Sequence, residues 1–109
     1  MRIEVRLVEA GSLLVKLEGP LDRDTVPDIR GQLLRYGKKK GVRDVEIDLA
    51  SVISVDTAGL AVLVELLIAV SRRGHVVRIR NSDANIERML RLACVDKLFE
   101  MQSVSKSGT

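Results

Sequence analysis

The chain has 109 residues, of which 46% are hydrophobic and 30% charged, and its formal net charge is +3. This length suits a single domain, and so hydrophobic a chain is not mostly disordered. Only 2% of the residues are aromatic, and positive and negative residues are interspersed. We therefore expect no nucleic-acid binding, because single-strand modules stack bases on aromatic rings.

The N-terminal residues carry a charge at every second position, so they do not resemble a signal peptide. The longest apolar stretch, 58–70, is interrupted by Glu65 and is shorter than the ~20 residues that cross a membrane. The lone Cys94 can form neither an internal disulfide nor a multi-cysteine zinc site. We expect a cytoplasmic protein with no direct membrane insertion and no cofactor.

The first half of the sequence predicts two strands and a helix. Apolar and charged residues alternate at 2–7 and again at 13–18, which predicts a β-hairpin, and a Gly-Pro pair then ends the second strand. A helix is expected to begin near Thr25 as its N-cap. The three lysines at 38–40 follow this helix, where cations are favourable and solvated, and they lack the pattern of a phosphate-binding loop.

The second half predicts two more strands and two more helices. In chain order these are a strand at 44–49, a connecting loop at 51–56, a helix at 58–73, a strand at 76–80 and a helix capped by Ser82 or Asp83. Leu98 and Phe99 would either add a short edge strand or pack against the end of the fold. Because the strands alternate, one sheet face should be open to water. We expect an α/β fold with a mixed four- to five-stranded sheet and helices packed on one face. Residues 1–102 would form this domain, and 103–109 a disordered polar tail.

The long helix at 58–73 has two apolar sides. At 100° per residue, its expected core stripe is Leu60, Leu63, Val64, Leu67 and Val70. The opposite side collects Ala58, Ala61, Val62, Glu65, Ile68, Ala69 and Arg72. This side has only two charged residues, which is few for a helix face exposed to water. Either neighbouring helices cover part of it, or it is a docking surface for another protein.

The start of this helix is the most informative segment. Asp56 or Thr57 is the expected N-cap, and capping alone would explain both residues. Gly59 in the first turn costs about 1 kcal/mol relative to alanine, which suggests that something approaches the backbone closely. A hydroxyl at a helix N-terminus also suits phosphorylation, because the helix dipole tolerates a phosphate there. The added charge would disrupt an apolar interface rather than the fold.

No pattern argues for an enzyme. The lone His75 stands in a predicted turn with no sequence feature that marks a nucleophile beside it. The sequence also has no cluster with metal-ligand spacing and no glycine-rich fingerprint after a strand.

At these residues the sequence resembles the STAS domain, which bacterial anti-sigma-factor antagonists share with the cytoplasmic tails of sulfate transporters. The resemblance covers nearly the whole chain. It rests on Leu17-Glu18-Gly19-Pro20-Leu21-Asp22, on Ile47-Asp48-Leu49 with Val52, on Val55-Asp56-Thr57-Ala58-Gly59-Leu60, and on Gly74, Val76, Asn81-Ser82 and Leu98-Phe99-Glu100 in order.

The resemblance implies a function. In the antagonists, the hydroxyl residue after the signature Asp is phosphorylated by an anti-sigma factor that is also a serine/threonine kinase, the unmodified form binds that partner, and a phosphatase resets it. Thr57 is then the acceptor, and Asp22 lies in the neighbouring family loop. The expected partner-binding residues are Asp22, Ser54, Asp56, Thr57, Ala58, Gly59, Val62 and Glu65.

Two alternatives remain. Many antagonists have Ser-Ser or Ser-Thr before the Gly, whereas this chain has Thr57-Ala58. The segment also resembles the STAS subunit of the ABC transporter that maintains lipid asymmetry, in which the Thr helps to bind the ATPase and need not be phosphorylated. The ending at 91–100 looks more like the antagonists, which we therefore rank first. A nucleotide-binding module is the weakest alternative, since only a helix N-terminus could cradle phosphate.

Overall fold

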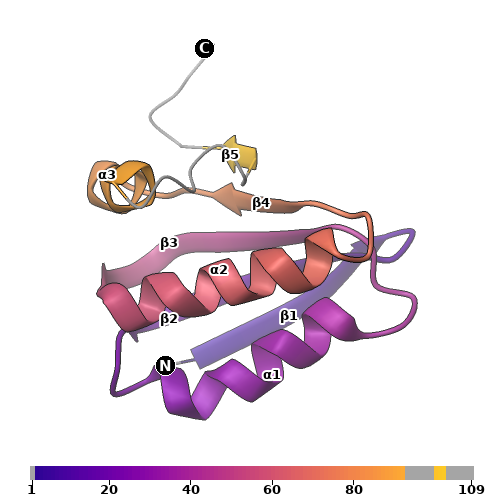
Figure 1. The fold of residues 1–109 in the computed structure, drawn as a ribbon, viewed down its shortest axis with the longest axis horizontal. Helices are drawn as coiled ribbons and strands as arrows, with labels where there is room; N and C mark the ends of the chain where they lie inside the picture. The colour runs from indigo at the N-terminus through magenta and orange to yellow at the C-terminus, as the bar shows by residue number, and fades with distance from the viewer. Residues whose placement is uncertain (1, 93–99, 103–109) are drawn as a thin grey trace.

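The computed structural model describes residues 2–92 and 100–102. Its five-stranded sheet has the order β1-β2-β3-β4-β5, in which β1 and β2 are antiparallel and the other neighbours are parallel (Figure 1). The strands are β1 (Arg2–Glu9), β2 (Ser12–Leu21), β3 (Val45–Val55), β4 (Val77–Arg80) and β5 (Glu100–Gln102). The predicted hairpin and mixed sheet are confirmed.

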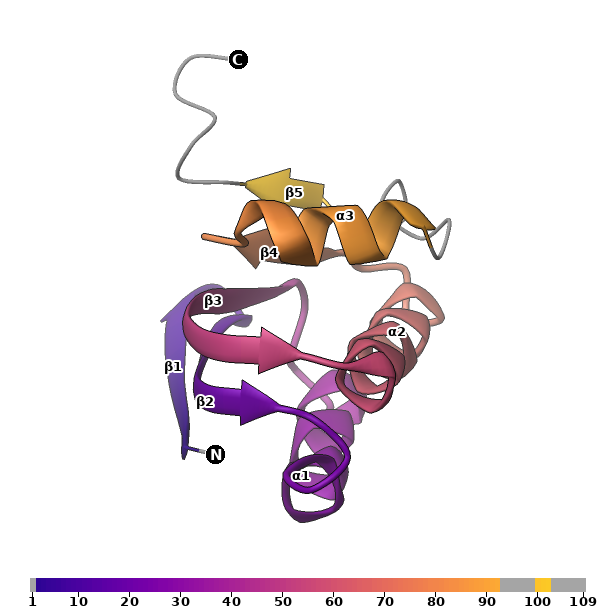
Figure 2. The same cartoon turned by 90° about the vertical axis from the view of Figure 1, so that its left-hand side faces the viewer.

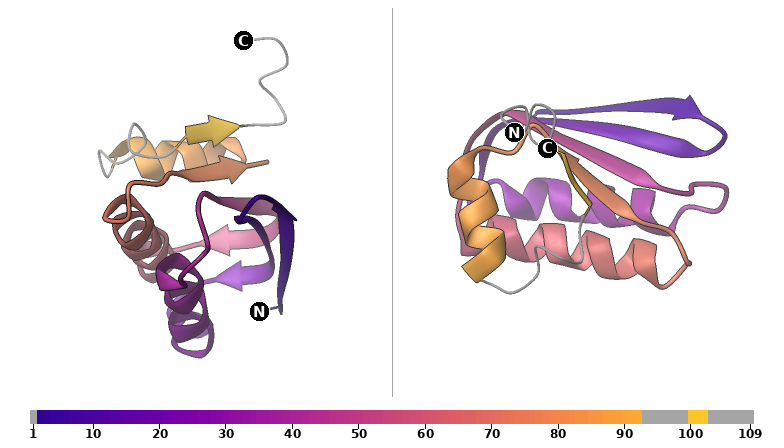
Figure 3. Two further views of the ribbon diagram at one scale, coloured as in Figure 1. Left: turned by 90° about the vertical axis from the view of Figure 1, so that its right-hand side faces the viewer. Right: turned by 90° about the horizontal axis from the view of Figure 1, so that it is seen from above.

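Three helices connect the parallel strands, namely α1 (Val26–Lys38), α2 (Thr57–Ser71) and α3 (Ala84–Leu92). Figures 1 and 2 show α1 and α2 side by side, and in Figure 1 α3 lies beyond the end of β4. Seen from above in Figure 3, α1 and α2 lie on one side of the sheet, as predicted, and α3 lies at the end of the strands. None of the helices in the described ranges is long and apolar enough to cross a membrane.

The core lies between the sheet and these helices. Val15, Ile47 and Ile79 come from the inward side of three adjacent strands, and each is fully buried. Leu33 of α1 and Leu63 of α2 belong to the same buried cluster. The alternation that predicted the strands therefore places one apolar face of the sheet under the helix layer.

The opposite face of the sheet carries charges. The cross-strand row Glu4, Lys16, Asp48 and Arg80 alternates in sign across four strands. Arg80 also forms an ion pair with Glu46 at 3.2 Å. These half-exposed charges confirm the prediction of a face open to water.

Two strand boundaries were predicted wrongly. The segment 51–56 is not a connecting loop, because β3 continues to Val55 and pairs with the end of β2. The Gly-Pro pair does not end β2 either. Gly19 adopts a positive φ of 103°, and the register shifts on both sides of it, so an irregular ladder carries the strand on to Leu21.

The helix starts agree better with the sequence. Thr25 is the N-cap of α1 as predicted, although its side chain makes no capping hydrogen bond. At α3 the cap is Asp83, which accepts a hydrogen bond from the Ile86 N–H at 2.9 Å, whereas Ser82 is buried. The predictions for Leu98, Phe99 and the tail at 103–109 lie outside the described residues.

Candidate functional site

The candidate site lies where the β2–α1 loop meets the start of α2. The crossovers through α1 and α2 begin at this end, so Asp22 and Asp56 come together although they are far apart in the sequence. In Figure 1 the starts of α1 and α2 both lie at the left-hand end of the helix layer. The carboxyl ends of β2 and β3 therefore present two loops on one surface.

Asp56 joins these two loops. Its Oδ1 accepts a hydrogen bond from the Gly59 N–H at 3.0 Å, which makes it the N-cap of α2. Its Oδ2 accepts from the Arg23 N–H at 3.1 Å, and its own N–H donates to the Leu21 carbonyl at 3.2 Å. One carboxylate thus holds both the helix start and the loop opposite it.

These contacts also act on the charge of Asp56. The hydrogen bond from Gly59 is the main cause that holds the pKa of the Asp56 carboxyl below its ordinary value, and the N–H and positive charge of Arg23 act in the same direction. Partial desolvation opposes them but does not reverse the shift. The carboxylate is therefore ionised at neutral pH.

Asp22 organises the β2–α1 loop. Its Oδ1 accepts hydrogen bonds from the Asp24 N–H at 2.9 Å and the Thr25 N–H at 3.1 Å. The Thr25 hydroxyl accepts from the Asp22 N–H at 3.0 Å and donates to the Pro20 carbonyl at 2.9 Å. The loop is closed by its own polar groups, so Asp22 stays near the surface in a defined position.

Thr57 is the first residue of α2, and its side chain is exposed. Within the described part of the chain, its hydroxyl makes no hydrogen bond, because Asp56 already caps the helix. Ala58 beside it is half-buried. The hydroxyl therefore does not contribute a hydrogen bond to the fold and is exposed at the surface.

Gly59 is needed by the fold. It is buried, and a Cβ built on it would lie 2.1 Å from the carbonyl oxygen of Leu21. The close approach predicted from this glycine is thus made by strand β2 of the same chain. Gly59 presents no side chain or exposed surface to a partner, so it is left out of the site.

The outward placement of Val62 is wrong. Val62 is fully buried and Ala69 is buried as well, whereas Ile68 is 46% exposed. Leu66, which the predicted core stripe omitted, is also buried. The reason is that α2 packs against α1 as well as the sheet, and Gly37 of α1 makes room for the Leu66 side chain. Of the two alternatives, cover by a neighbouring helix explains this part of the face.

Glu65 is bonded to α1. The Arg30 Nε donates to both carboxylate oxygens of Glu65, at 3.0 and 3.1 Å, and the Arg30 Nη2 contacts Oε2 as well. Arg30 holds the pKa of the Glu65 carboxyl below its ordinary value. Glu65 is also about 12 Å along the helix from Thr57, at 1.5 Å per residue. We therefore place it outside the group of residues at the helix start.

Two residues near the site, Ile53 and Arg23, were not predicted from the sequence. Ile53 is 78% exposed on the last part of β3, beside the exposed Ser54. The β-branched residues at 52, 53 and 55 were the available signal that this segment is a strand. Arg23 acts through its backbone N–H, and no sequence pattern marks such a contact. Among the described residues, no group of three or more His, Cys, Asp or Glu is placed to hold a metal ion.

The arrangement was compared with known proteins. A family model described as "Mlab, STAS domain" matches residues 6–102. The chain belongs to the STAS domain family. The match includes both loops of the site, so the resemblance inferred from the sequence is confirmed.

Solved structures similar to this STAS domain include anti-sigma-factor antagonists and parts of transporters. A putative anti-sigma factor antagonist from Thermotoga maritima superposes with a TM-score of 0.84 and 19% identity, over 96% of this chain and 90% of that one. The Bacillus cell fate determinant SpoIIAA in its phosphorylated form gives 0.75 and 11%, over 97% and 96%. The murine anion transporter Slc26a9 gives 0.72 and 18%, over 89% of this chain but 17% of the transporter. At these identities the matches show a shared STAS fold.

Proposed function

We propose that this STAS domain is a non-enzymatic switch of the anti-sigma-factor antagonist type. The unmodified protein would bind an anti-sigma factor that is also a serine/threonine kinase, phosphorylation of Thr57 would release it, and a phosphatase would restore binding. The observation that carries the proposal is the exposed Thr57 hydroxyl at a helix start that Asp56 already caps. The fold shared with antagonists, one of them solved in a phosphorylated form, supports it.

The physical effect of a phosphate follows from its neighbours. The first turn of a helix has backbone N–H groups without intrahelical acceptors, so the fold tolerates a phosphate there. The phosphate adds a charge of about −1.5 to −2 at neutral pH. Asp56 stays ionised and Asp22 lies in the adjacent loop, so the added charge accumulates on a surface that is already acidic. A partner fitted to the unmodified surface would be repelled, while the helix remains folded.

The partner surface that we propose is smaller than the sequence analysis expected. It contains Asp22, Ser54, Asp56, Thr57 and Ala58, and it omits the buried Gly59 and Val62 and the distant Glu65. Ile53 is added because its exposed apolar side chain lies on the strand that leads to the site. Such an apolar residue next to a hydroxyl is a natural interface contact.

The test requires a kinase-type anti-sigma factor, which is to be sought among the products of the neighbouring genes. After incubation with that protein and ATP, mass spectrometry should place one phosphate on Thr57, and Thr57→Ala should abolish it. Ser71→Ala is the matched control, because Ser71 is an exposed hydroxyl residue at the opposite end of the same helix, and it should leave phosphorylation unchanged. Thr57→Glu should weaken binding of the anti-sigma factor in calorimetry. Phosphate at another residue, or unaltered binding of Thr57→Glu, would contradict the proposal.

A second candidate is a STAS subunit that binds the ATPase of a phospholipid-transport ABC complex. Two observations support this second candidate, namely the description of the matching family model and the similarity of the fold to transporter STAS domains. This candidate predicts copurification with an ATPase subunit. Thr57→Glu would then disrupt the complex, although no phosphate is found on the wild-type protein.

A further inference from the structure

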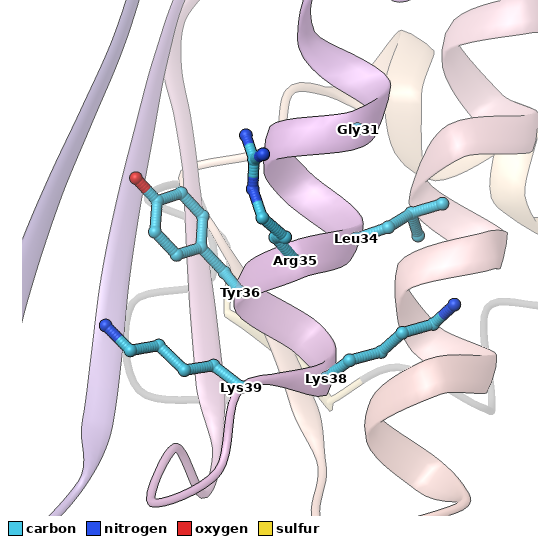
Figure 4. A pocket seen from close by; sticks show the side chains of 6 residues that line it. All are labelled: Gly31, Leu34, Arg35, Tyr36, Lys38 and Lys39. Carbon is cyan, nitrogen blue, oxygen red and sulfur yellow. The ribbon is translucent and has the colours of Figure 1, made fainter.

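The C-terminal halves of α1 and α2 form a groove at the end of the helix layer opposite Thr57. Its floor is apolar, because Leu34 of α1 lines it together with Ile68 and Ala69 of α2. The groove has a volume of about 380 Å³. Figure 4 shows Leu34 and Lys38 reaching from α1 toward the neighbouring helix. We call this surface the α1–α2 groove.

Cations border the α1–α2 groove. Its charged lining residues are Arg30, Lys38, Arg72, Arg73 and a single carboxylate, Glu65. Glu65 is bonded to Arg30, and Arg73 donates hydrogen bonds to two backbone carbonyl groups of the same chain. Lys38 and Arg72 are exposed, and neither forms an ion pair closer than 4 Å within the described ranges, although the charge of Lys38 helps to lower the pKa of Glu65. These two cations are available to a partner.

A second hollow on the other side of α1 extends this positive surface. It shares Leu34 and Lys38 with the α1–α2 groove and adds Arg35 and Lys39, as Figure 4 shows. The two hollows together have six cations and one carboxylate, a net charge of +5. The whole chain carries +3, so the rest of the molecule is net negative. The charge is therefore concentrated at this end of the helix layer.

We propose that the α1–α2 groove binds an amphipathic helix of a partner protein, with acidic residues beside its apolar face. Helices commonly dock by placing apolar side chains in such grooves, and carboxylates on the partner would complement Lys38 and Arg72. A second copy of this chain would bring like charges together. The phosphate groups of a nucleic acid or of an anionic membrane would bind the cations, but they would make no use of the apolar side chains that line the groove.

This surface is separate from the proposed phosphorylation site. Helix α2 has 15 residues, so its two ends are about 22 Å apart at 1.5 Å per residue. A partner at Thr57 and a helix in the groove can therefore bind at the same time. The inference stands or falls independently of the proposed switch.

The test is a selection from a displayed library of helix-forming peptides of about 14 residues, roughly four turns long, with randomised surface positions. Peptides enriched on the wild-type protein should have apolar residues at helical spacing flanked by Asp or Glu. The double variant Lys38→Glu/Arg72→Glu should weaken the best peptide at least about tenfold in fluorescence anisotropy, and high salt should act similarly. Ile68→Ser should also weaken it.

The matched control is Arg6→Glu/Arg88→Glu, which makes the same charge change at exposed positions on β1 and α3. It should leave the affinity unchanged, as should Thr57→Glu. Amide chemical shifts should change around Leu34 and Ile68. The proposal is overturned if no peptide is enriched, if the enriched peptides lack acidic residues, or if the groove variant binds them as tightly as wild type. Binding of duplex DNA or phosphatidylglycerol vesicles through Lys38 and Arg72, without peptide binding, would also overturn it.

Discussion

Replacing Gly59 by alanine tests the contact that places α2 against the sheet. The added Cβ would lie 2.1 Å from the Leu21 carbonyl oxygen and 2.9 Å from its carbonyl carbon, whereas carbon–oxygen contacts are ordinarily about 3.3 Å or longer. The helix start and the strand end would have to separate by about 1 Å. Both are backbone, and the hydrogen bond from the Asp56 N–H to Leu21 ties them together, so neither can yield cheaply.

The expected magnitude is a difference between two effects. Overpacking of a buried site costs about 1–3 kcal/mol, and the upper part of this range, about 2–3 kcal/mol, applies because the clashing atoms belong to the backbone. The better helix propensity of alanine returns about 1 kcal/mol. We expect Gly59→Ala to lower the free energy of unfolding by about 1–2 kcal/mol. With a urea m-value of about 2 kcal/mol per molar, the midpoint should fall by roughly 0.5–1 M.

Two other glycines serve as controls in the same urea titration, followed by circular dichroism. Gly31 is exposed in α1 and has no atom within 4 Å of its built Cβ, so Gly31→Ala should stabilise the protein by about 0.5–1 kcal/mol. At Gly37 the nearest atom is the flexible Leu66 Cδ1, at 2.7 Å, which predicts an intermediate effect. If Gly59→Ala were as stable as wild type, the close-approach reasoning would be refuted.

Three further predictions use the same unfolding assay. Val62→Ser should destabilise the protein by about 2–4 kcal/mol, because it leaves a cavity and buries a hydroxyl, whereas Ile68→Ser should cost less than about 1 kcal/mol; equal effects would contradict the assigned orientation of α2. The pKa of Asp56 is lowered in the folded protein, so its ionised carboxylate stabilises the fold above the unfolded-state pKa. The advantage of wild type over Asp56→Asn should therefore be constant from about pH 5 to 7 and shrink below about pH 4, and a constant difference down to pH 2 would count against it. Glu65→Gln should lower the urea midpoint only slightly, and less at high salt, because the ion pair with Arg30 is largely exposed. A large loss of stability that does not depend on salt would contradict this small contribution of the pair.

Several features of the fold could be predicted from residue patterns within single segments. The alternation of apolar and charged residues correctly predicted β1, β2, β4 and the open face of the sheet, because burial on one face of a strand has a period of two residues. The residue types at the start of α2 correctly pointed to a cap and a close approach. Those features depend on neighbours within one segment.

Features that depend on contacts between segments were not predictable in this way. The prediction of a single core stripe on α2 rested on the expectation that this helix packs against the sheet alone. In the structure α2 packs against both the sheet and α1, and Val62 is buried for that reason. The cations of α1 and those after α2 are more than 30 positions apart, so nothing in the sequence indicated that they form one positive surface. They meet because both helices run antiparallel to the same parallel strands.

The bonds of Asp56 have a consequence for the kinetics of association. Its carboxylate holds the β2–α1 loop and the start of α2 at once, so a partner meets loops that already have their final shape. Binding then loses little conformational entropy and needs no slow rearrangement. Asp56→Ala should therefore slow association as measured by stopped flow, since the free protein would occupy the binding-competent shape for only a fraction of the time.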